Sequence, residues 1–415
     1  MKRLTLILLC ITSIGFAQTN GLSLDSCIQM AKRNYPLIKQ NNLITDNEKN
    51  NISSDNKNWL PKAQFISKAT YQSEVISFLG MSFPHDSYIT AIDAEETLYD
   101  GGQTHNQKKL DRLSAETDLL KNEVELYKLI DRVNQLYSNI LLTRESINTL
   151  NVYKDDINNK RTILSASVQN GMMLQSNLDG LEAEELKTEQ SIVEAKDNLQ
   201  ALYFSLGQLI NKTIDDSTPM STDPIMSLSK GDEINRPELK LFDAQKSMLD
   251  VRHKLNNTGA LPRLSIGGEG AYGRPGPNFL NQDMRFFAQA NVSLKWNIGS
   301  LYNLHNERQS IDISKKMVDV QREVFEFNLK STLATQTAAI NSLKEIIEKD
   351  KQIIEKRHSI KETAAKQLEN GTITTTDYLT ELNAEMQATL NQKVHEIKLM
   401  NAITNYNSTK GINNF

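Results

Sequence analysis

The sequence predicts a mainly helical protein that also carries a small number of membrane β-strands, and three observations support this fold class. The nine prolines leave two long proline-free tracts, residues 85–218 and 278–415, in which long helices can form. The prolines also recur, because Pro36 and Pro237 lie 201 residues apart. Within each half, a helical period gives way to strict alternation and then returns. The predicted unit, present twice, is helix, strand, strand, long helix and helix.

An internal duplication accounts for this recurrence. Leu60-Pro61-Lys62 aligns with Leu261-Pro262-Arg263 at the same spacing, and a later Asn-Gly pair ending at Gly171 aligns with one ending at Gly371. The expected divisions are a signal peptide (1–17), a first structural repeat (18–214), a linker (215–233) and a second structural repeat (234–415).

The N-terminus has the pattern of a secretory signal peptide. Lys2 and Arg3 precede an apolar run, and small residues near Ala17 suit cleavage there. The run is too short and too early for a spanning helix. Cys10 lacks the small preceding residues expected of a lipid attachment site, which favours a plain signal. Cys27 would then be the single mature cysteine, expected as a small buried residue.

In each half, a helical tract leads into a pair of strands. The first tract covers residues 36–58 and the second 237–256, and alternation over 63–72 predicts a strand. The partner strands are predicted over 89–99 and, more clearly, over 286–298. In this last strand, Phe286, Ala288, Ala290, Val292 and Leu294 are expected to face lipid, and Gln289, Asn291 and Lys295 to face a lumen.

One segment fits the G-x-G-x-x-G pattern of a dinucleotide-binding loop, from Gly268 to Gly273. Two prolines follow it closely, where that loop requires a helix start. The equivalent segment of the first repeat, residues 67–72, contains no glycine. The glycines are therefore predicted to lie in a strand and to leave room for a close neighbour.

The longest predicted helices cover residues 103–169 and 303–369. At 1.5 Å per residue, each would be about 100 Å long, whereas a bilayer core is about 30 Å thick. These helices are too long and too polar to be membrane spans. After each Asn-Gly pair, a further helix is expected to run to about residue 210 or 408. Apolar residues recur every seven positions, as expected for helices packed in a coiled coil: Leu119, Leu126, Val133, Ile140 and Ile147, and then Leu333, Ile340, Ile347 and Ile354.

Four strands cannot close a membrane barrel, because the smallest bacterial barrels use about eight and an open edge in lipid leaves backbone groups unsatisfied. Several chains are therefore expected to share one barrel. A trimer would supply about twelve strands.

Five short features mark the order of the elements: Leu22-Ser23-Leu24-Asp25, Arg236-Pro237-Glu238-Leu239, the Leu-Pro pair before each first strand, Leu98-Tyr99-Asp100-Gly101-Gly102, and the two Asn-Gly turns. In these features and their order, the sequence resembles the TolC-like outer-membrane efflux family over essentially its whole mature length. The resemblance implies a trimeric α-helical barrel in the periplasm and a shared 12-stranded β-barrel in the outer membrane. It also implies a periplasmic adaptor protein and an inner-membrane transporter as partners.

The function implied by the resemblance is that of an exit duct with porin-like activity. The alternatives are the outer-membrane component of a type I protein secretion system and a periplasmic coiled-coil or adaptor protein without a channel. An enzyme is not expected, because no set of catalytic residues and no cofactor or metal motif is found; the six histidines form no ligand spacing. A formal net charge of −4 also argues against a nucleic-acid partner.

The resemblance also implies acidic residues that narrow the periplasmic entrance, six residues after the glycine of the turn. This position is Asp377 in the second repeat and Asn177 in the first, and Thr380 stands where the family pattern has a second aspartate. The helix dipole also stabilises an acidic residue in the first turn of a helix. Asp377 is therefore either a pore residue or a helix-capping residue, and the sequence leaves both open.

Overall fold

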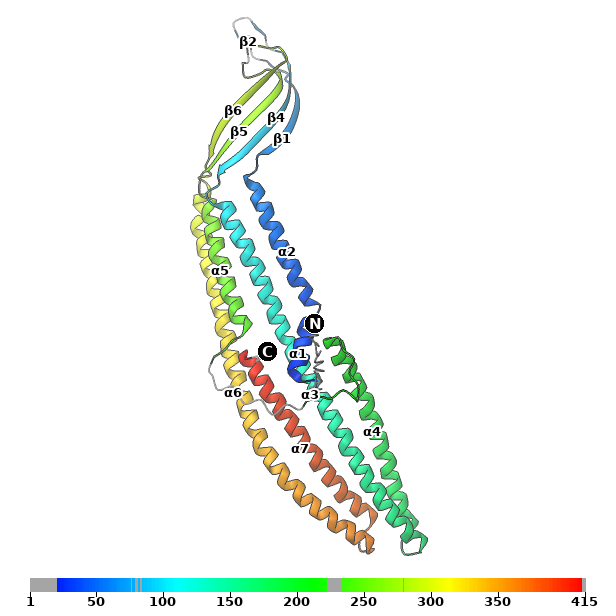
Figure 1. The fold of residues 1–415 in the computed structure, drawn as a ribbon. Helices are drawn as coiled ribbons and strands as arrows, with labels where there is room; N and C mark the ends of the chain where they lie inside the picture. Colours follow the sequence, from blue (N-terminus) through cyan, green and yellow to red (C-terminus); the bar gives the residue numbers. More distant parts are fainter. Residues whose placement is uncertain are drawn as a thin grey trace, which may run out of the picture. The chain divides into compact units, whose positions relative to one another are not determined.

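The computed structural model describes residues 21–75, 77–78, 81–82, 84–221, 233–278 and 280–412 (Figure 1). The predicted signal peptide at 1–17, with Cys10, lies outside the described residues, as does most of the predicted linker at 215–233. The chain divides into two compact units. The helical unit comprises Met1–Tyr35, Lys128–Glu233 and Leu333–Phe415, and the sheet unit comprises Pro36–Tyr127 and Ile234–Thr332.

The predicted order of elements is confirmed in both repeats, and each repeat contributes to both units. Two short strands, β2 (Ser77–Phe78) and β3 (Met81–Ser82), form an additional hairpin that is too short to show a period in the sequence. The first repeat contains α1 (Leu24–Asn34), α2 (Leu37–Asn56), the 3₁₀ turn η1 (Lys57–Trp59), β1 (Lys62–Tyr71), β4 (Asp86–Tyr99), α3 (Gln103–Gln169) and α4 (Gln175–Ile210). The second contains α5 (Pro237–Thr258), β5 (Arg263–Arg274), β6 (Arg285–Lys295), α6 (Ser300–Glu369) and α7 (Thr375–Lys410).

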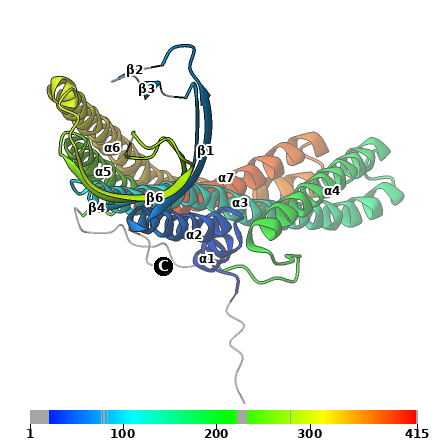
Figure 2. The same ribbon diagram turned by 90° about the horizontal axis from the view of Figure 1, so that it is seen from above.

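The sheet has four antiparallel strands in the order β1-β4-β5-β6, and Figure 2 shows that it curves. The two strands of each repeat pair with one another, and the β4–β5 ladder joins the repeats. Two strands, β1 and β6, therefore form the edges of this sheet. Because the sheet lies within the sheet unit, all of its register is defined by a single compact body.

The strand β6 ends at Lys295, three residues before the predicted end at Ile298. The equivalent strand of the first repeat, β4, continues to Tyr99 because its ladder with β5 runs on to the pair of Tyr99 and Leu264, beyond the end of its ladder with β1 at Glu95. In contrast, β6 pairs only with β5, and that ladder ends where Arg263 meets Lys295. The next residue, Trp296, instead donates its indole N–H to the carbonyl oxygen of Ala260 at 2.9 Å.

The G-x-G-x-x-G segment lies entirely within β5, so the prediction of a strand is confirmed. A Cβ atom on Gly273 would overlap the carbonyl oxygen of Tyr88 and come within 2.8 Å of the Cα atom of Ile89. Glycine at this position thus permits the close approach of β4. A phosphate-binding loop would need a turn and a following helix, and here the strand runs through the motif.

The helical unit contains α1, α4, α7 and the adjoining parts of α3 and α6. Helix α1 is capped by Ser23, whose hydroxyl accepts the Ser26 amide, and ends at Asn34 because Pro36 disfavours helical geometry in the residue before it. The Cys27 side chain is fully buried, as predicted, and burial raises the pKa of its thiol to about 12. Within the described residues, no helix has a stretch long and apolar enough to span a bilayer.

Candidate functional site

The curved sheet presents one apolar face and one polar face. Cross-strand partners share a face, and the register aligns Ser67, Thr90, Tyr272 and Phe286 in one row. The remaining residues of that face follow by alternation along each strand. Large apolar side chains on it are exposed to solvent: Phe65, Tyr71, Tyr88, Ile92, Ile266, Tyr272, Phe286, Val292 and Leu294.

Charged side chains on the apolar face stand only at its two ends, among the described strand residues. Asp86 pairs with Arg274 at the end near the β2–β3 hairpin, and the Arg274 guanidinium lies over the Tyr88 ring at 5.8 Å. Glu96 lies at the end near the helices. An apolar band with polar residues at both margins is the surface that a transmembrane strand presents to lipid.

The opposite face is polar and carries its own hydrogen bonds. Lys295 forms an ion pair with Glu95 at 3.2 Å, and Glu95 accepts a hydrogen bond from Ser265 at 2.5 Å. The buried side chains of the sheet, Ala91, Ser265 and Ala271, all lie on this face, as expected for the inner side of a curved sheet. The face suits contact with water in a lumen.

In the helical unit, the α3–α4 and α6–α7 hairpins turn with the same backbone geometry. Gly171 has a φ of 73° and Gly371 a φ of 67°, the left-handed region that glycine adopts at helix ends. The amide of the following residue, Met172 or Thr372, donates to a carbonyl five residues earlier at 2.9 Å in both. The sequence prediction of two equivalent Asn-Gly turns is confirmed.

Asp377 is exposed and closes a capping box with Thr374 at the start of α7. Its carboxylate accepts the Thr374 amide at 2.9 Å and the Thr374 hydroxyl at 2.7 Å, and these bonds lower the pKa of Asp377. Thr380 lies one turn farther along the helix. Both residues line an open groove of about 410 Å³ between α6 and α7.

Asn177 occupies the equivalent position of α4 and has different contacts. Its side-chain oxygen accepts a hydrogen bond from the Thr375 hydroxyl at 3.1 Å, which links the two hairpins. Leu174, at the helix N-cap, has no side chain that could form a capping box. The structure therefore brings Asp377 and Thr380 to one groove, and it places Asn177 at the contact between hairpins.

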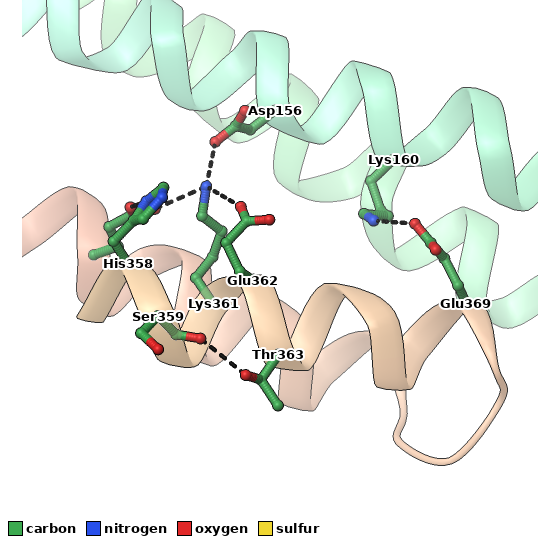
Figure 3. Close-up of polar contacts among 9 residues, drawn as sticks. Asp156, Lys160, His358, Ser359, Lys361, Glu362, Thr363 and Glu369 are labelled. Atoms are coloured by element: carbon green, nitrogen blue, oxygen red, sulfur yellow. Dashed lines mark hydrogen bonds and ion pairs between the residues drawn. The ribbon is translucent and has the colours of Figure 1, made fainter. Parts of the chain in front are cut away.

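Just above the turns, a mixed cluster holds the four helices together. Its apolar part is made by Tyr153, Ile157, Leu164, Leu181, Ala364, Leu368, Tyr378 and Leu382, which are all buried. Figure 3 shows its charged part, in which α6 faces α3. Lys160 of α3 forms an ion pair with Glu369 at 2.8 Å, and Lys361 of α6 reaches Asp156 of α3 at 3.4 Å.

Lys361 is the central cation of this cluster. Its side chain is only 10% exposed, and it also contacts Glu385 at 3.2 Å and Glu362 at 3.3 Å. Burial lowers the pKa of Lys361, but the three carboxylates outweigh burial and raise that pKa above its ordinary value. Burial also raises the pKa of the nearby Tyr378 to about 12.

This charged cluster was not predicted from the sequence, although the internal duplication contains a signal for it. Arg161 and Glu185 of the first repeat align with Lys361 and Glu385 of the second at an offset of 200, and the first pair also forms an ion pair, at 3.0 Å. A base and an acid retained at the same spacing in both repeats indicate a structural contact between the helices of one hairpin.

No metal-binding arrangement is found among the described residues. Two of the histidines instead contact carboxylates on the neighbouring helix. The His358 ring lies 2.6 Å from Glu385, and the His395 ring lies 2.7 Å from Asp350.

Comparison with known proteins shows a likeness in fold without a likeness in sequence. No protein-family model and no curated protein matches the sequence. The outer membrane protein VceC of Vibrio cholerae matches with a TM-score of 0.69 and 11% identity, over 94% of this chain and 97% of its own. The CmeC outer membrane channel of Campylobacter jejuni matches with a TM-score of 0.67 and 14% identity, over 94% and 85%. The open MtrE outer membrane channel of Neisseria gonorrhoeae matches with a TM-score of 0.68 and 13% identity, over 94% of this chain and 88% of its own.

The chain has the fold of a TolC-like outer-membrane channel. Two of the similar solved structures, CmeC and MtrE, are described as outer membrane channels. The duplicated unit predicted from the sequence is a feature of this fold.

Proposed function

We propose that the chain is the outer-membrane exit duct of a tripartite efflux system and conducts substrates from the periplasmic side to the outside. The observation that carries the proposal is the sheet, which has an exposed apolar face, a polar inner face and two edge strands. A sheet of this kind is stable in a bilayer only when its edges are paired. Three copies would close a barrel of about twelve strands.

The long helices support the same proposal. They are far longer than a bilayer is thick and mostly polar, so they would extend from the barrel into the periplasm. The turn of the first hairpin exposes Met172 and Leu174, two apolar side chains suited to a protein contact. We assign the periplasmic adaptor to this end of the duct and the inner-membrane transporter beyond it.

Membrane fractionation and channel recording test the proposal. The protein should be recovered with outer membranes, should migrate as a trimer on a gel before boiling and as a monomer afterwards, and should open ion-conducting channels in planar bilayers. A monomer that stays in the soluble periplasmic fraction and conducts no ions would refute a duct and favour an adaptor.

The lipid-facing residues can be tested by a matched pair of substitutions in β6. Val292→Arg places a charge on the apolar face, which costs about 2 to 4 kcal/mol near the bilayer midplane. Ser293→Arg places the same charge on the polar face, one residue along the strand. The first variant should yield much less heat-modifiable trimer than the second. Equal trimer yields of the two variants would contradict the proposal that one face of β6 contacts lipid, namely that of Phe286, Ala288, Ala290, Val292 and Leu294.

We further propose that Asp377 contributes to the periplasmic constriction, together with the neutral side chains of Thr380, three residues along α7, and Asn177, at the equivalent position of the first repeat. Three carboxylates around one axis attract cations and repel anions. Asp377→Asn should weaken the cation preference of reconstituted channels, and Thr380→Asp should strengthen it. Both effects should fade in high salt, because the Debye length falls from about 10 Å at 0.1 M to about 3 Å at 1 M.

Reversal potentials under a salt gradient measure this preference directly. Asn177→Asp serves as the comparison, because that side chain contacts the neighbouring hairpin and does not line the groove. Unchanged potentials in Asp377→Asn and Thr380→Asp would limit Asp377 to its capping role.

A further inference from the structure

In the single chain, the two edge strands of the sheet, β1 and β6, have hydrogen-bonded strand partners on one side only within the described residues. In a bilayer, the free N–H and C=O groups of such an edge need a partner. We propose that β6 of one copy pairs with β1 of the next in a single register, which the internal duplication specifies. This inference rests on the proposed trimer and adds its inter-subunit contact.

The register within each repeat shows that the duplication is retained in three dimensions. In the first repeat, Lys62 faces Glu95 and Tyr71 faces Asp86. The equivalent residues of the second repeat again face each other. They lie 201 residues later on the first strand of the repeat and 200 residues later on the second. These pairs are Arg263 with Lys295 and Tyr272 with Phe286.

The ladder between repeats supplies the template for the contact between copies. There the second strand of repeat one, β4, pairs with the first strand of repeat two, β5, and Ile92 faces Gly270. Across the subunit boundary, the second strand of repeat two would meet the first strand of repeat one. Shifting both residues by the same 200 and 201 places Val292 opposite Ala69 of the partner subunit. The flanking pairs become Ala290 with Tyr71 of the partner subunit and Leu294 with Ser67 of the partner subunit.

The faces of the sheet provide an independent check on this register. Val292 lies on the apolar face, and the row through Ser67 and Phe286 puts Ala69 there as well. A slip of one residue would set Val292 against Lys68 of the partner subunit, whose side chain belongs to the polar face. The derived register therefore keeps one continuous apolar surface across the subunit boundary.

A second check comes from two aromatic residues at the helix end of the strands. The same shift places Trp296 opposite Phe65 of the partner subunit, where the template pairs Glu96 with Ile266. Trp296 is 53% exposed and Phe65 is 71% exposed in the single chain. Cross-strand aromatic pairs stabilise a sheet, and this pair would extend β6 beyond Lys295 as β4 extends to Tyr99.

Cysteine cross-linking in native outer membranes tests the register. Val292→Cys is combined in turn with Ala69→Cys, Ser67→Cys and Tyr71→Cys, in a Cys27→Ala background that removes the buried native thiol. Copper phenanthroline then oxidises neighbouring thiols, which join only when their Cα atoms lie within about 7 Å. The pair Ile92→Cys with Gly270→Cys is the matched control, because it has the equivalent geometry within one chain and Gly270 has room for a side chain.

The expected result is covalent dimers and trimers on non-reducing gels with Ala69→Cys, several-fold more than with Ser67→Cys or Tyr71→Cys. The control should oxidise without any increase in mass. A maximum at Ser67→Cys or Tyr71→Cys would overturn the register. Absence of covalent oligomers in all three, with the control oxidised, would overturn edge pairing itself. Single-channel conductance, recorded separately, tests the proposed function, so a wrong register and a wrong function give different results.

Discussion

The two hairpins of the helical unit are copies of one sequence, yet they bury different faces. Tyr153 of α3 is 3% exposed, whereas its equivalent in α6, Ile353, is 48% exposed. One turn later, Ile157 is fully buried, and its equivalent, Arg357, forms an ion pair with Glu381 at 3.1 Å. The backbone of the two turns is nevertheless the same.

The two repeats therefore share the residues that determine the backbone conformation of the turns, and they differ in the residues that make contacts between helices. Glycine at each turn is required by a positive φ, which applies equally in both copies. A buried face depends on which helix lies against it. Because the two hairpins pack against each other within one chain, their equivalent faces meet different surroundings. The exposed stripe on α6, Ile346, Ile353 and Ile360, repeats every seven residues and is available to another helix.

The largest loss of stability should come from replacing Ile157, which is buried although its equivalent in the second repeat, Arg357, is not. Ile157→Ala leaves a cavity among four helices and is expected to lower the free energy of unfolding by about 3 kcal/mol. Arg357→Ala, at the equivalent position, removes an exposed ion pair and should cost less than about 1 kcal/mol. Urea denaturation of the detergent-solubilised protein, followed by helical circular dichroism, measures both. Equal losses would mean that the two faces are not distinct.

The second effect concerns the ion pairs retained in both repeats. Lys361→Met removes the buried cation that three carboxylates contact and should destabilise the helical unit by about 2 kcal/mol. Arg161→Met removes a cation that is 38% exposed and pairs with the single carboxylate of Glu185, so its cost should be below about 1 kcal/mol. The same denaturation assay applies, and a larger loss in Arg161→Met would reverse the ranking of the two sites.

The third effect concerns the side-chain cap at the start of the second helix of each hairpin, which α7 has and α4 lacks. Thr374→Val removes the capping hydroxyl of α7 and should cost about 1 kcal/mol. Leu174→Val changes the equivalent position of α4, which makes no capping bond, and should be near neutral. Conversely, Leu174→Thr combined with Asn177→Asp would supply the residues of a capping box to the first hairpin. A loss of stability in that double variant would show that the Asn177 contact with Thr375 matters more than the cap.

The smallest effect is the pH dependence of the same cap. Hydrogen bonds from Thr374 lower the pKa of Asp377 below its ordinary value of 3.8. Because the pKa is lower in the folded state, the carboxylate contributes stability above pH 3.8 and loses this contribution as the pH falls through the lowered value. In the Asp377→Asn variant, the denaturation midpoint should therefore depend less on pH, and only in this acidic range. Identical acid profiles for the variant and the parent protein would contradict the cap.

By itself, the sequence determined the order of the elements and most of their bounds. Proline positions, the period of the apolar residues and the two Asn-Gly turns act on the local backbone, so they predicted α3 over residues 103–169 and α4 to residue 210. The glycines of β5 were predicted as strand residues for the same reason. The apolar face of β6 also followed from alternation alone, although which side faces lipid remains a prediction.

Only the tertiary structure decided what each equivalent position contacts. It brought Asn177 against Thr375 and surrounded Lys361 with carboxylates from three helices. It also ended β6 at Lys295, since a strand extends only as far as a neighbour pairs with it. The contacts of Asn177 with Thr375 and of Lys361 with Asp156 join segments that are about 200 residues apart in the chain. A local period carries no information about which distant segment will lie opposite, because that choice is made by packing in three dimensions.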